Sequence, residues 1–314
     1  MPEEGLLKRN LAGRHLLDET ADLLANCDFK LERTRIAVFV CGGSPKVKEG
    51  EIPSWRGAFL EWINAQGHAS RLEIVLAEKA YDAAVKQESK FLNISDFETI
   101  LADLSDCVLL FPESAGSYAE AGVFASNQKI LTKVLVANEF NYHNSSSFLN
   151  LGPLHTLTST SRFSQAIVLS GDVKLNNTAF SVIKDRIEEN ARRNRTAIKW
   201  TSSVDVNLRE KSALILAIIR IAGLLSVDDL NHLLLKISLD IPLAELDQIV
   251  RILLMFKQIE RQTDDVFKFV EASRFEAAIE GAKGKLTGLT ASYREFYVRN
   301  FPRLLDSRKE VGAE

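Results

Sequence analysis

The chain reads Cys107-Val108-Leu109-Leu110 and then Phe111-Pro112-Glu113-Ser114-Ala115-Gly116-Ser117-Tyr118-Ala119-Glu120-Ala121-Gly122. This stretch predicts a buried strand, a turn rich in small residues and a helix that begins at Ser117. Open α/β sheets bind their ligands outside the carboxyl ends of their strands. Glu120, in the first turn of the predicted helix, is therefore expected to present a carboxylate at the reactive edge of a sheet.

Two roles are open to Glu120 at this position. The exposed amides and the positive dipole end of a helix N-terminus keep a nearby carboxylate ionised, as a nucleophile that attacks a sugar carbon requires. Ser117-x-x-Glu120 is also a capping box, in which the glutamate only accepts a hydrogen bond from the Ser117 amide. The motif by itself is compatible with both the catalytic and the structural role.

The segments around this motif alternate between strand and helix. Strands are predicted at 35–41, 72–76, 107–111 and 133–137, with a further one at 165–169, and helices at 54–66, 96–104 and 117–128. The first strand is apolar and stops at Gly42, as buried parallel strands do. Such alternation implies right-handed βαβ crossovers. We therefore predict an α/β domain with an open, doubly wound parallel sheet.

The alternation stops at Asn207, which marks a domain boundary. Helices are predicted at 208–224, 227–239 and 242–256, followed by two strands on either side of a polar turn. Three helices and a β-hairpin are the winged-helix arrangement. We therefore divide the chain into an N-terminal helical segment (1–34), the α/β domain (35–175), a helix and linker (176–206) and a smaller winged-helix domain (207–314).

Composition places the chain among soluble globular proteins. Its 314 residues are 46% apolar and 26% charged, which suits two domains with cores of their own. A net charge of -3 gives no global attraction to nucleic acid or to an anionic membrane. No run approaches the ~20 apolar residues of a membrane helix, and three widely spaced cysteines fit a reducing compartment. We therefore expect a cytoplasmic protein that does not bind membranes.

A second candidate element ends the first predicted strand. The glycines of Cys41-Gly42-Gly43-Ser44-Pro45 let a ribose or a phosphate approach the backbone closely, or they form a simple turn. Trp55 and Arg56 follow, where a ring could stack on a base and a guanidinium could hold a phosphate; a helix core with a surface arginine is the alternative. G-x-G-x-x-G and G-x-x-x-x-G-K-[ST] are both missing, which disfavours a standard Rossmann dinucleotide fold and a P-loop kinase.

Two further carboxylates lie near the strand that leads to Glu120. Glu113 lies in the turn itself and is a candidate to bind sugar hydroxyls or to protonate a leaving base. Glu98 precedes the strand, and it could reach the same edge or belong to a solvated helix face. The five histidines show no metal-ligand spacing, so no metal site is predicted.

Five motifs carry a resemblance to a known family. They are Phe39-Val40-Cys41-Gly42-Gly43, Ser54-Trp55-Arg56, Glu98-x-Ile100-Leu101-Ala102, Leu110-Phe111-Pro112-Glu113-Ser114-x-Gly116-Ser117-x-x-Glu120-x-Gly122-x-Phe124 and Ser147-Phe148-x-Asn150-x-Gly152-Pro153. Together they resemble the effector proteins of bacterial retron anti-phage systems, which carry a domain similar to nucleoside 2-deoxyribosyltransferases followed by a winged-helix domain. The resemblance covers nearly the whole chain in architecture, while its specific motifs lie between about residues 36 and 155.

The resemblance implies a catalytic role for Glu120. In the transferase family a glutamate at this place attacks C1′ of the nucleoside sugar and forms a glycosyl-enzyme intermediate. The family usually reads Asp-Ser-Gly-Thr-x-x-Glu, and its aspartate falls on Ser114 here, so that Glu113 could take its part in catalysis. Substrate binding is expected of the residues around these two: Cys41, Gly42, Gly43, Trp55, Arg56, Glu98, Ser114, Gly116 and Ser117.

The same resemblance bears on substrate and partners. Nicotinamide leaves NAD from an already cationic ring and needs no acid, whereas a purine must be protonated to leave as a neutral base. We therefore expect a retron toxin, without cofactor, that hydrolyses the N-glycosidic bond of NAD or a nucleotide. The implied partners are the retron reverse transcriptase and its RNA-linked multicopy single-stranded DNA, and we expect a homo-oligomer or a higher assembly.

Two other functions stay open. One is a nucleoside deoxyribosyltransferase, or a phosphoribohydrolase with the motif Pro-Gly-Gly-x-Gly-Thr-x-x-Glu, two of whose glycines Glu113 and Ser114 replace. The other is a non-catalytic DNA- or protein-binding scaffold, although the predicted recognition helix 242–256 carries Arg251 beside Glu245 and Asp247 and is a poor major-groove reader. Basic residues that could contact phosphates or a partner protein are Arg192, Arg193, Arg195, Lys283, Lys285, Arg294, Arg299 and Arg303.

Overall fold

The chain folds into two compact units. The computed structural model describes residues 5–26, 30–33, 36–45, 53–67, 70–78, 94–143, 145–193, 208–255, 258–263, 266–270, 277–280 and 283–305. One unit spans residues 35–196, and the other combines residues 1–34 with 197–314. The N-terminal helical segment therefore belongs to the same unit as the C-terminal residues.

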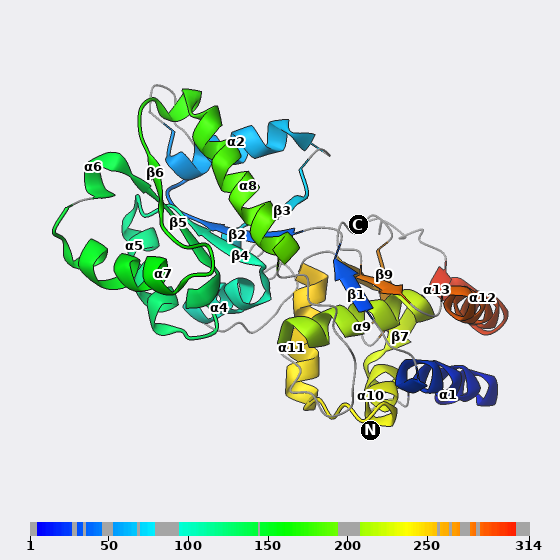
Figure 1. Ribbon diagram of the computed structural model, residues 1–314. Coiled ribbons are helices and arrows are strands. Elements are labelled where there is room, and N and C mark those ends of the chain that lie inside the picture. The colour runs from blue at the N-terminus through cyan, green and yellow to red at the C-terminus, as the bar shows by residue number, and fades with distance from the viewer. Residues whose placement is uncertain are drawn as a thin grey trace, which may run out of the picture. The chain divides into compact units, whose positions relative to one another are not determined.

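A parallel sheet forms the centre of the 35–196 unit (Figure 1). Its strands are β2 (Ile36–Cys41), β3 (Leu72–Val75), β4 (Cys107–Leu110), β5 (Val134–Glu139) and β6 (Ile167–Leu169), in the order β3-β2-β4-β5-β6. Every residue of β2 and β4 is buried, which explains why these strands read as continuous apolar runs. The predicted parallel sheet is confirmed.

Helices cover both faces of this sheet. On one face, α2 (Trp55–Ala65) and α8 (Asn177–Arg193) share a hydrophobic core with the strands. On the other face, Phe124 of α5 (Ala115–Ser126) meets Phe39 of β2 edge to face, with ring centroids 6.4 Å apart. The sheet is therefore doubly wound, as predicted. The remaining elements of this unit are α4 (Ile94–Leu104), η2 (Leu131–Lys133), α6 (Phe140–His143), the π-helical turn η3 (Asn150–Leu154), α7 (His155–Thr160) and η4 (Val173–Leu175).

The second unit is mainly helical. Its helices are α1 (Leu11–Asn26), α9 (Leu208–Ala222), α10 (Val227–Lys236), α11 (Leu243–Met255), α12 (Lys283–Asn300) and α13 (Pro302–Leu305). An antiparallel sheet joins β7 (Leu224–Ser226), β9 (Val266–Phe269) and β8 (Ile259–Arg261), while β1 (Lys30–Arg33) pairs with β10 (Ala277–Glu280). Three helices and the β8–β9 hairpin lie where the sequence predicts them, and their assignment to the winged-helix class stays a prediction.

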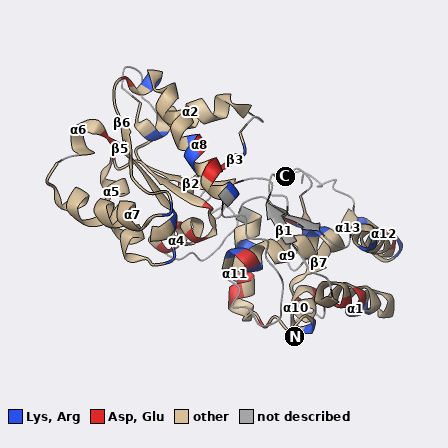
Figure 2. Ribbon diagram, viewed as in Figure 1, with Lys and Arg blue, Asp and Glu red and all other residues tan. Residues whose placement is uncertain are grey.

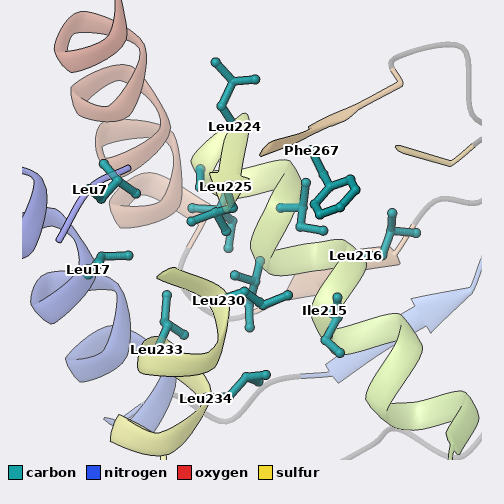
Figure 3. Close-up of a cluster of buried hydrophobic side chains, with 14 of the residues drawn as sticks. Leu7, Leu17, Ile215, Leu216, Leu224, Leu225, Leu230, Leu233, Leu234 and Phe267 are labelled. Carbon is teal, nitrogen blue, oxygen red and sulfur yellow. The ribbon is translucent and has the colours of Figure 1, made fainter. Parts of the chain in front are cut away.

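One hydrophobic cluster holds the second unit together (Figure 3). It joins Leu7 and Leu17 of the N-terminal segment with Ile215 of α9, Leu230 of α10 and Phe267 of β9. All five side chains are buried. Because fully burying a leucine stabilises a fold by about 1.5–3 kcal/mol, the N-terminal segment contributes to the stability of this unit.

A buried carboxylate anchors the N-terminal segment to α10. The Ser226 hydroxyl caps this helix and accepts a hydrogen bond from the Asp229 amide at 3.1 Å. Asp229 is 0% exposed, and its Oδ2 and Oδ1 accept the backbone N–H groups of Leu7 and Lys8, each at 3.0 Å. Buried donors that lose an ionised acceptor pay their full desolvation penalty. Asp229 therefore determines where the N-terminal segment lies.

Asp229→Ala is expected to destabilise the second unit by about 2–4 kcal/mol, because two buried amides lose a charged acceptor. Amide hydrogen exchange of α1 and α10 in the full chain measures this loss. Asp18→Ala is the matched control: Asp18 forms an ion pair with Lys236 at the surface, with 48% of its side chain exposed, and its loss is expected to change stability by less than about 1 kcal/mol. Equal exchange in the two variants would contradict the anchoring role.

Candidate active site

The candidate site lies where the strand order of the sheet reverses. β2 pairs with β3 on one side and with β4 on the other, and Cys41 and Leu110 lie opposite each other at the carboxyl ends of β2 and β4. A reversal of this kind leaves a crevice beyond the strand ends, because the connections on the two sides diverge. The segments that follow β2 and β4 carry the residues that the sequence predicts for the site.

Glu113, in the turn after β4, connects that turn to the loop after β2 and to the start of α2. Its Oε1 accepts the amides of Gly43 at 2.9 Å and Arg56 at 3.0 Å, and its Oε2 accepts the amide of Trp55 at 2.7 Å. Trp55 and Arg56 open α2, where backbone N–H groups lack helical partners and attract negative charge. Both carboxylate oxygens are thus occupied by backbone, an arrangement that suits a structural anchor better than an acid or a ligand for sugar hydroxyls.

The glycines after β2 make room for this anchor. A Cβ built on Gly42 would come within 3.0 Å of Glu113 Oε1 and 2.9 Å of the Arg56 Cβ. At Gly43 it would come within 2.9 Å of the Ser54 Cβ and 3.2 Å of the Glu113 Cδ. Real side chains essentially never approach so closely. The sequence predicts that a ligand comes close to the backbone at these glycines. In the structure, the side chains of Glu113, Arg56 and Ser54 come close to it.

The helix that carries Glu120 begins earlier than predicted. Ser114, not Ser117, is its N-cap, and a capping box forms between the two serines: the Ser117 amide donates to Ser114 Oγ at 3.2 Å and the Ser114 amide donates to Ser117 Oγ at 2.9 Å. The expected capping box between Ser117 and Glu120 is therefore wrong, because a hydroxyl already satisfies that end of the helix. Glu120 lies in the second turn of α5 rather than the first.

The Glu120 carboxylate takes no part in capping α5 and lies in a partly buried environment. Its Oε2 is buried, and within the described residues it has no hydrogen-bond partner. The pKa of Glu120 is raised to about 7: burial is the largest cause and the Glu98 and Glu78 carboxylates add to it, whereas Arg56 and a hydrogen bond with the Cys41 thiol lower it. A buried carboxylate oxygen without a hydrogen-bond partner is unfavourable in its charged form, and binding a ligand or a proton relieves that cost.

Glu120 belongs to a group of ionisable side chains from four elements. Cys41 ends β2, Glu98 lies on α4, and Arg56 forms a bidentate ion pair with Glu78, with Nη1–Oε1 2.8 Å and Nη2–Oε2 2.9 Å. Burial and then Glu78 raise the pKa of Glu98, and Arg56 lowers it. Burial, followed by the neighbouring glutamates, raises the pKa of the Cys41 thiol well above its usual value, so the thiol stays protonated. Such clusters of perturbed pKa values are typical of functional sites.

Glu78 is a member of this group that the sequence analysis missed. It follows shortly after β3, and 50% of its side chain is exposed. The rule that places functional groups at the carboxyl ends of parallel strands could have identified it, had it been applied to β3 as well as to β2 and β4. Its pairing with Arg56 means that this arginine, only 6% exposed, already has an anionic partner.

The other predicted residues have different surroundings. Trp55 is 5% exposed, and its ring packs edge to face on Phe180, with 6.4 Å between centroids, so it belongs to the core and offers no face to a base. Gly116 lies in the exposed first turn of α5, where an added Cβ would meet only Ser114 Oγ at 3.9 Å. Backbone approach by a ligand is therefore feasible at Gly116.

The predicted basic residues lie on both units. Arg192 is 66% exposed and lies 3.9 Å from Glu188 on α8, and Arg299 forms an ion pair with Glu295 on α12. On α11, Arg251 pairs with Asp247 at 2.7 Å, which further weakens that helix as a DNA reader. Arg195 lies outside the described residues.

In the described ranges, no three His, Cys, Asp or Glu side chains come together in a way that could hold a metal ion. Among the helices that the structure describes, none has both the length and the hydropathy of a membrane span.

Comparison with known proteins places the site in a family. Residues 53–261 match a family model described as STM3845 retron effector protein. The "Retron Ec86 putative ribosyltransferase/DNA-binding protein" of Escherichia coli is 29% identical over 123 residues, which cover 39% of this chain and 38% of that protein. Its Ec73 counterpart of the same name and organism is 32% identical over 127 residues, 40% of this chain and 39% of that protein. The chain thus matches about two fifths of each relative's length.

The family match covers more than half of the chain. It begins just before α2 and includes Glu98, Glu113 and Glu120, and it continues beyond the α/β unit through α9, α10 and α11 to β8. The carboxylate cluster and helices α9, α10 and α11 of the second unit are thus part of one family pattern. The chain belongs to the STM3845 retron effector family.

Proposed function

We propose that this retron effector is a toxin that hydrolyses the N-glycosidic bond of NAD or a nucleotide, with Glu120 as the nucleophile. The observation that carries the proposal is the Glu120 carboxylate, half-buried at the reversal point of the sheet, with Oε2 unpartnered among the described residues. Open α/β folds place their ligands at this edge. The ribosyltransferase names of the relatives support chemistry at a sugar carbon.

The reaction would proceed in two displacements. A Glu120 oxygen attacks C1′ of the ribosyl group as the bond from C1′ to the base nitrogen breaks, and the electron pair of that bond leaves with the base. Water then attacks C1′ of the glycosyl-enzyme as the bond from C1′ to the Glu120 oxygen breaks. The water loses one proton to solvent, the ribosyl product leaves with a hydroxyl at C1′ and its phosphates intact, and the Glu120 carboxylate is restored. Nicotinamide becomes neutral as it takes the electron pair, because its ring is cationic in NAD.

Glu98 is the better acid in this site. Glu113, expected from the sequence to serve as acid, has both oxygens engaged by backbone amides. Glu98 is half-buried, its pKa is raised, and its charge is felt by Glu120. Paired carboxylates with different environments can divide the roles of nucleophile and acid. A proton from Glu98 would allow purine bases to leave, which extends the substrate class beyond NAD.

The proposed partners follow from the family. The retron reverse transcriptase and its RNA-linked single-stranded DNA would bind the effector and restrain or organise it, and the DNA-binding names of the relatives are consistent with such a complex. The same relatives are named ribosyltransferases, which favours one alternative outcome: an acceptor base, rather than water, could take the sugar. Adding a free base to the reaction distinguishes transfer from hydrolysis.

Glu120→Gln is expected to lower base release from NAD and nucleotides by about 1,000-fold or more, because glutamine matches the shape of glutamate but is a poor nucleophile. Chromatography of free bases, with the full chain alone and with its retron complex, measures the rate. Glu61→Gln, an exposed change on α2, is the matched control and is expected to behave as the wild type. A glutamine variant as active as the wild type would rule out Glu120 as nucleophile.

Glu98→Gln is expected to separate two classes of substrate. Release of adenine from adenosine nucleotides, which needs protonation of the base, is expected to fall by about 100-fold or more. Nicotinamide release from NAD is expected to fall far less, because that leaving group needs no proton. Initial rates on both substrates, measured on the same protein preparation, decide the matter. An equal loss on both would assign Glu98 a structural role instead.

The raised pKa of Glu120 predicts opposite effects of pH on activity and on stability. A nucleophile must be ionised, so activity is expected to rise as pH increases through about 7. The folded protein favours the protonated form of Glu120, so ionisation of this group destabilises the fold. The loss of stability develops as pH rises from about 4.5, the ordinary pKa of a glutamate, to about 7, its pKa in the fold. Thermal melts followed by circular dichroism should show Glu120→Gln close to the wild type at pH 5 and more stable at pH 8, by about 5–10 °C, since each pKa unit corresponds to about 1.4 kcal/mol. Identical differences at the two pH values would contradict the shift.

A further inference from the structure

A second polar cavity lies at the opposite edge of the same sheet. It has a volume of about 290 Å³ and is lined by Arg162, Phe163, Ser164, Gln165, Arg186, Glu189 and Asn190. The first four residues form the turn that leads into β6, and the last three lie on α8. The Arg162 amide donates to the carbonyl of Thr132, just before β5, and the Arg162 side chain donates to the carbonyl of Asp106, just before β4. The cavity therefore lies at the amino ends of the strands, whereas Glu120 lies beyond their carboxyl ends.

The two guanidinium groups of this cavity are held in place by backbone carbonyls. Arg162 donates from Nη2 to the Asp106 carbonyl and lies over the Phe163 ring, 5.3 Å from its centroid. Arg186 donates from Nη1 to the Gln165 carbonyl at 2.7 Å. The turn is fixed in its own right, since Asn190 Nδ2 donates to the Arg162 carbonyl at 3.0 Å. Both guanidiniums thus have restricted orientations before any ligand arrives.

Most of the hydrogen-bonding capacity of these arginines is unused. A guanidinium has five N–H donors, and each of the two arginines uses a single side-chain donor in the bonds described above. Neither forms an ion pair with a carboxylate in the described part of the chain. Glu189 is the acidic member of the lining, so the lining carries a net positive charge.

We propose that this cavity binds a phosphate group, carried by a mononucleotide or by a nucleic-acid strand. Forked guanidinium groups match the oxygens of a phosphate, and arginine is favoured over lysine for such recognition. Arg186 and Arg162 would donate to the phosphate oxygens from two sides, with Asn190 and Gln165 beside them. Figure 2 shows that α8 carries basic and acidic residues together toward its C-terminal end. Attraction of a phosphate therefore depends on the arginines that line the cavity and not on a uniformly basic helix. The site is separate from Glu120 and does not depend on the proposed hydrolysis.

The test is binding by the full chain, measured by calorimetry with four probes: inorganic phosphate, thymidine 5′-monophosphate, thymidine and acetate. Arg186→Gln and Arg162→Gln are each expected to weaken binding of the two phosphate-bearing probes by about tenfold or more, the loss of one charge-assisted contact. Lys129→Gln, an exposed change in the same unit but outside the cavity, is the matched control and should bind within twofold of the wild type.

Each outcome decides for or against the site. Thymidine bound as tightly as its monophosphate, or acetate as tightly as phosphate, would overturn phosphate recognition. Binding that both glutamine variants retain would place the phosphate elsewhere, including at the Glu120 site. Arg186→Lys keeps the charge without the fork, and an intermediate affinity is expected of it. A single-stranded oligonucleotide then separates the two sources: tighter binding than the mononucleotide, lost in the same variants, identifies a strand as the ligand.

Discussion

The candidate active site depends on one carboxylate that accepts three backbone amides. Glu113 binds the loop after β2, the start of α2 and its own turn after β4, so that the two strands at the reversal point end in one rigid framework. The arrangement brings the buried Arg56 to the edge of the sheet. There it forms an ion pair with Glu78 and lowers the pKa of Glu120. Loss of this one anchor would release Gly43, Trp55 and Arg56, because the amides of all three donate to the Glu113 carboxylate.

This framework explains why the neighbouring glutamates can have different properties. Glu113 has its charge satisfied by the backbone, whereas Glu120 reaches a buried setting with an oxygen for which the described residues offer no partner. Glu98 and Glu120 then repel each other across the crevice, and burial keeps both pKa values raised. A carboxylate that accepts three backbone amides and a carboxylate with an unpartnered oxygen therefore lie seven positions apart in the same segment. Their difference comes from the atoms around them and not from residue type.

Much of the fold follows from the sequence, because hydrophobic period is a local property. The β-branched run of β2 and the apolar run of β4 predict buried parallel strands, and Ser226 predicts the start of α10. The sequence does not determine where α5 starts, because Ser114 and Ser117 both suit a cap and only the path of the chain shows which one serves. The sequence also does not show the contacts of Glu113 with α2 or of Trp55 with Phe180, because these contacts join segments far apart in sequence. The carboxylate cluster could be anticipated in part, but its partner Glu78 could not be ranked without the sheet order.

The discontinuous second unit has a consequence for how the chain is made. Leu7 finds its acceptor on Asp229, 222 residues later, so the N-terminal segment leaves the ribosome long before its partner exists. Along the sequence, the residues of the α/β unit come between the two parts of the other unit. The α/β unit is therefore fully synthesised once residue 196 has emerged from the ribosome. Domains generally fold as units during synthesis, at about 5–20 residues per second. The unit that carries Glu120 can therefore fold first. Helix α1 waits, for on the order of ten seconds at these rates, for the residues that will bury it.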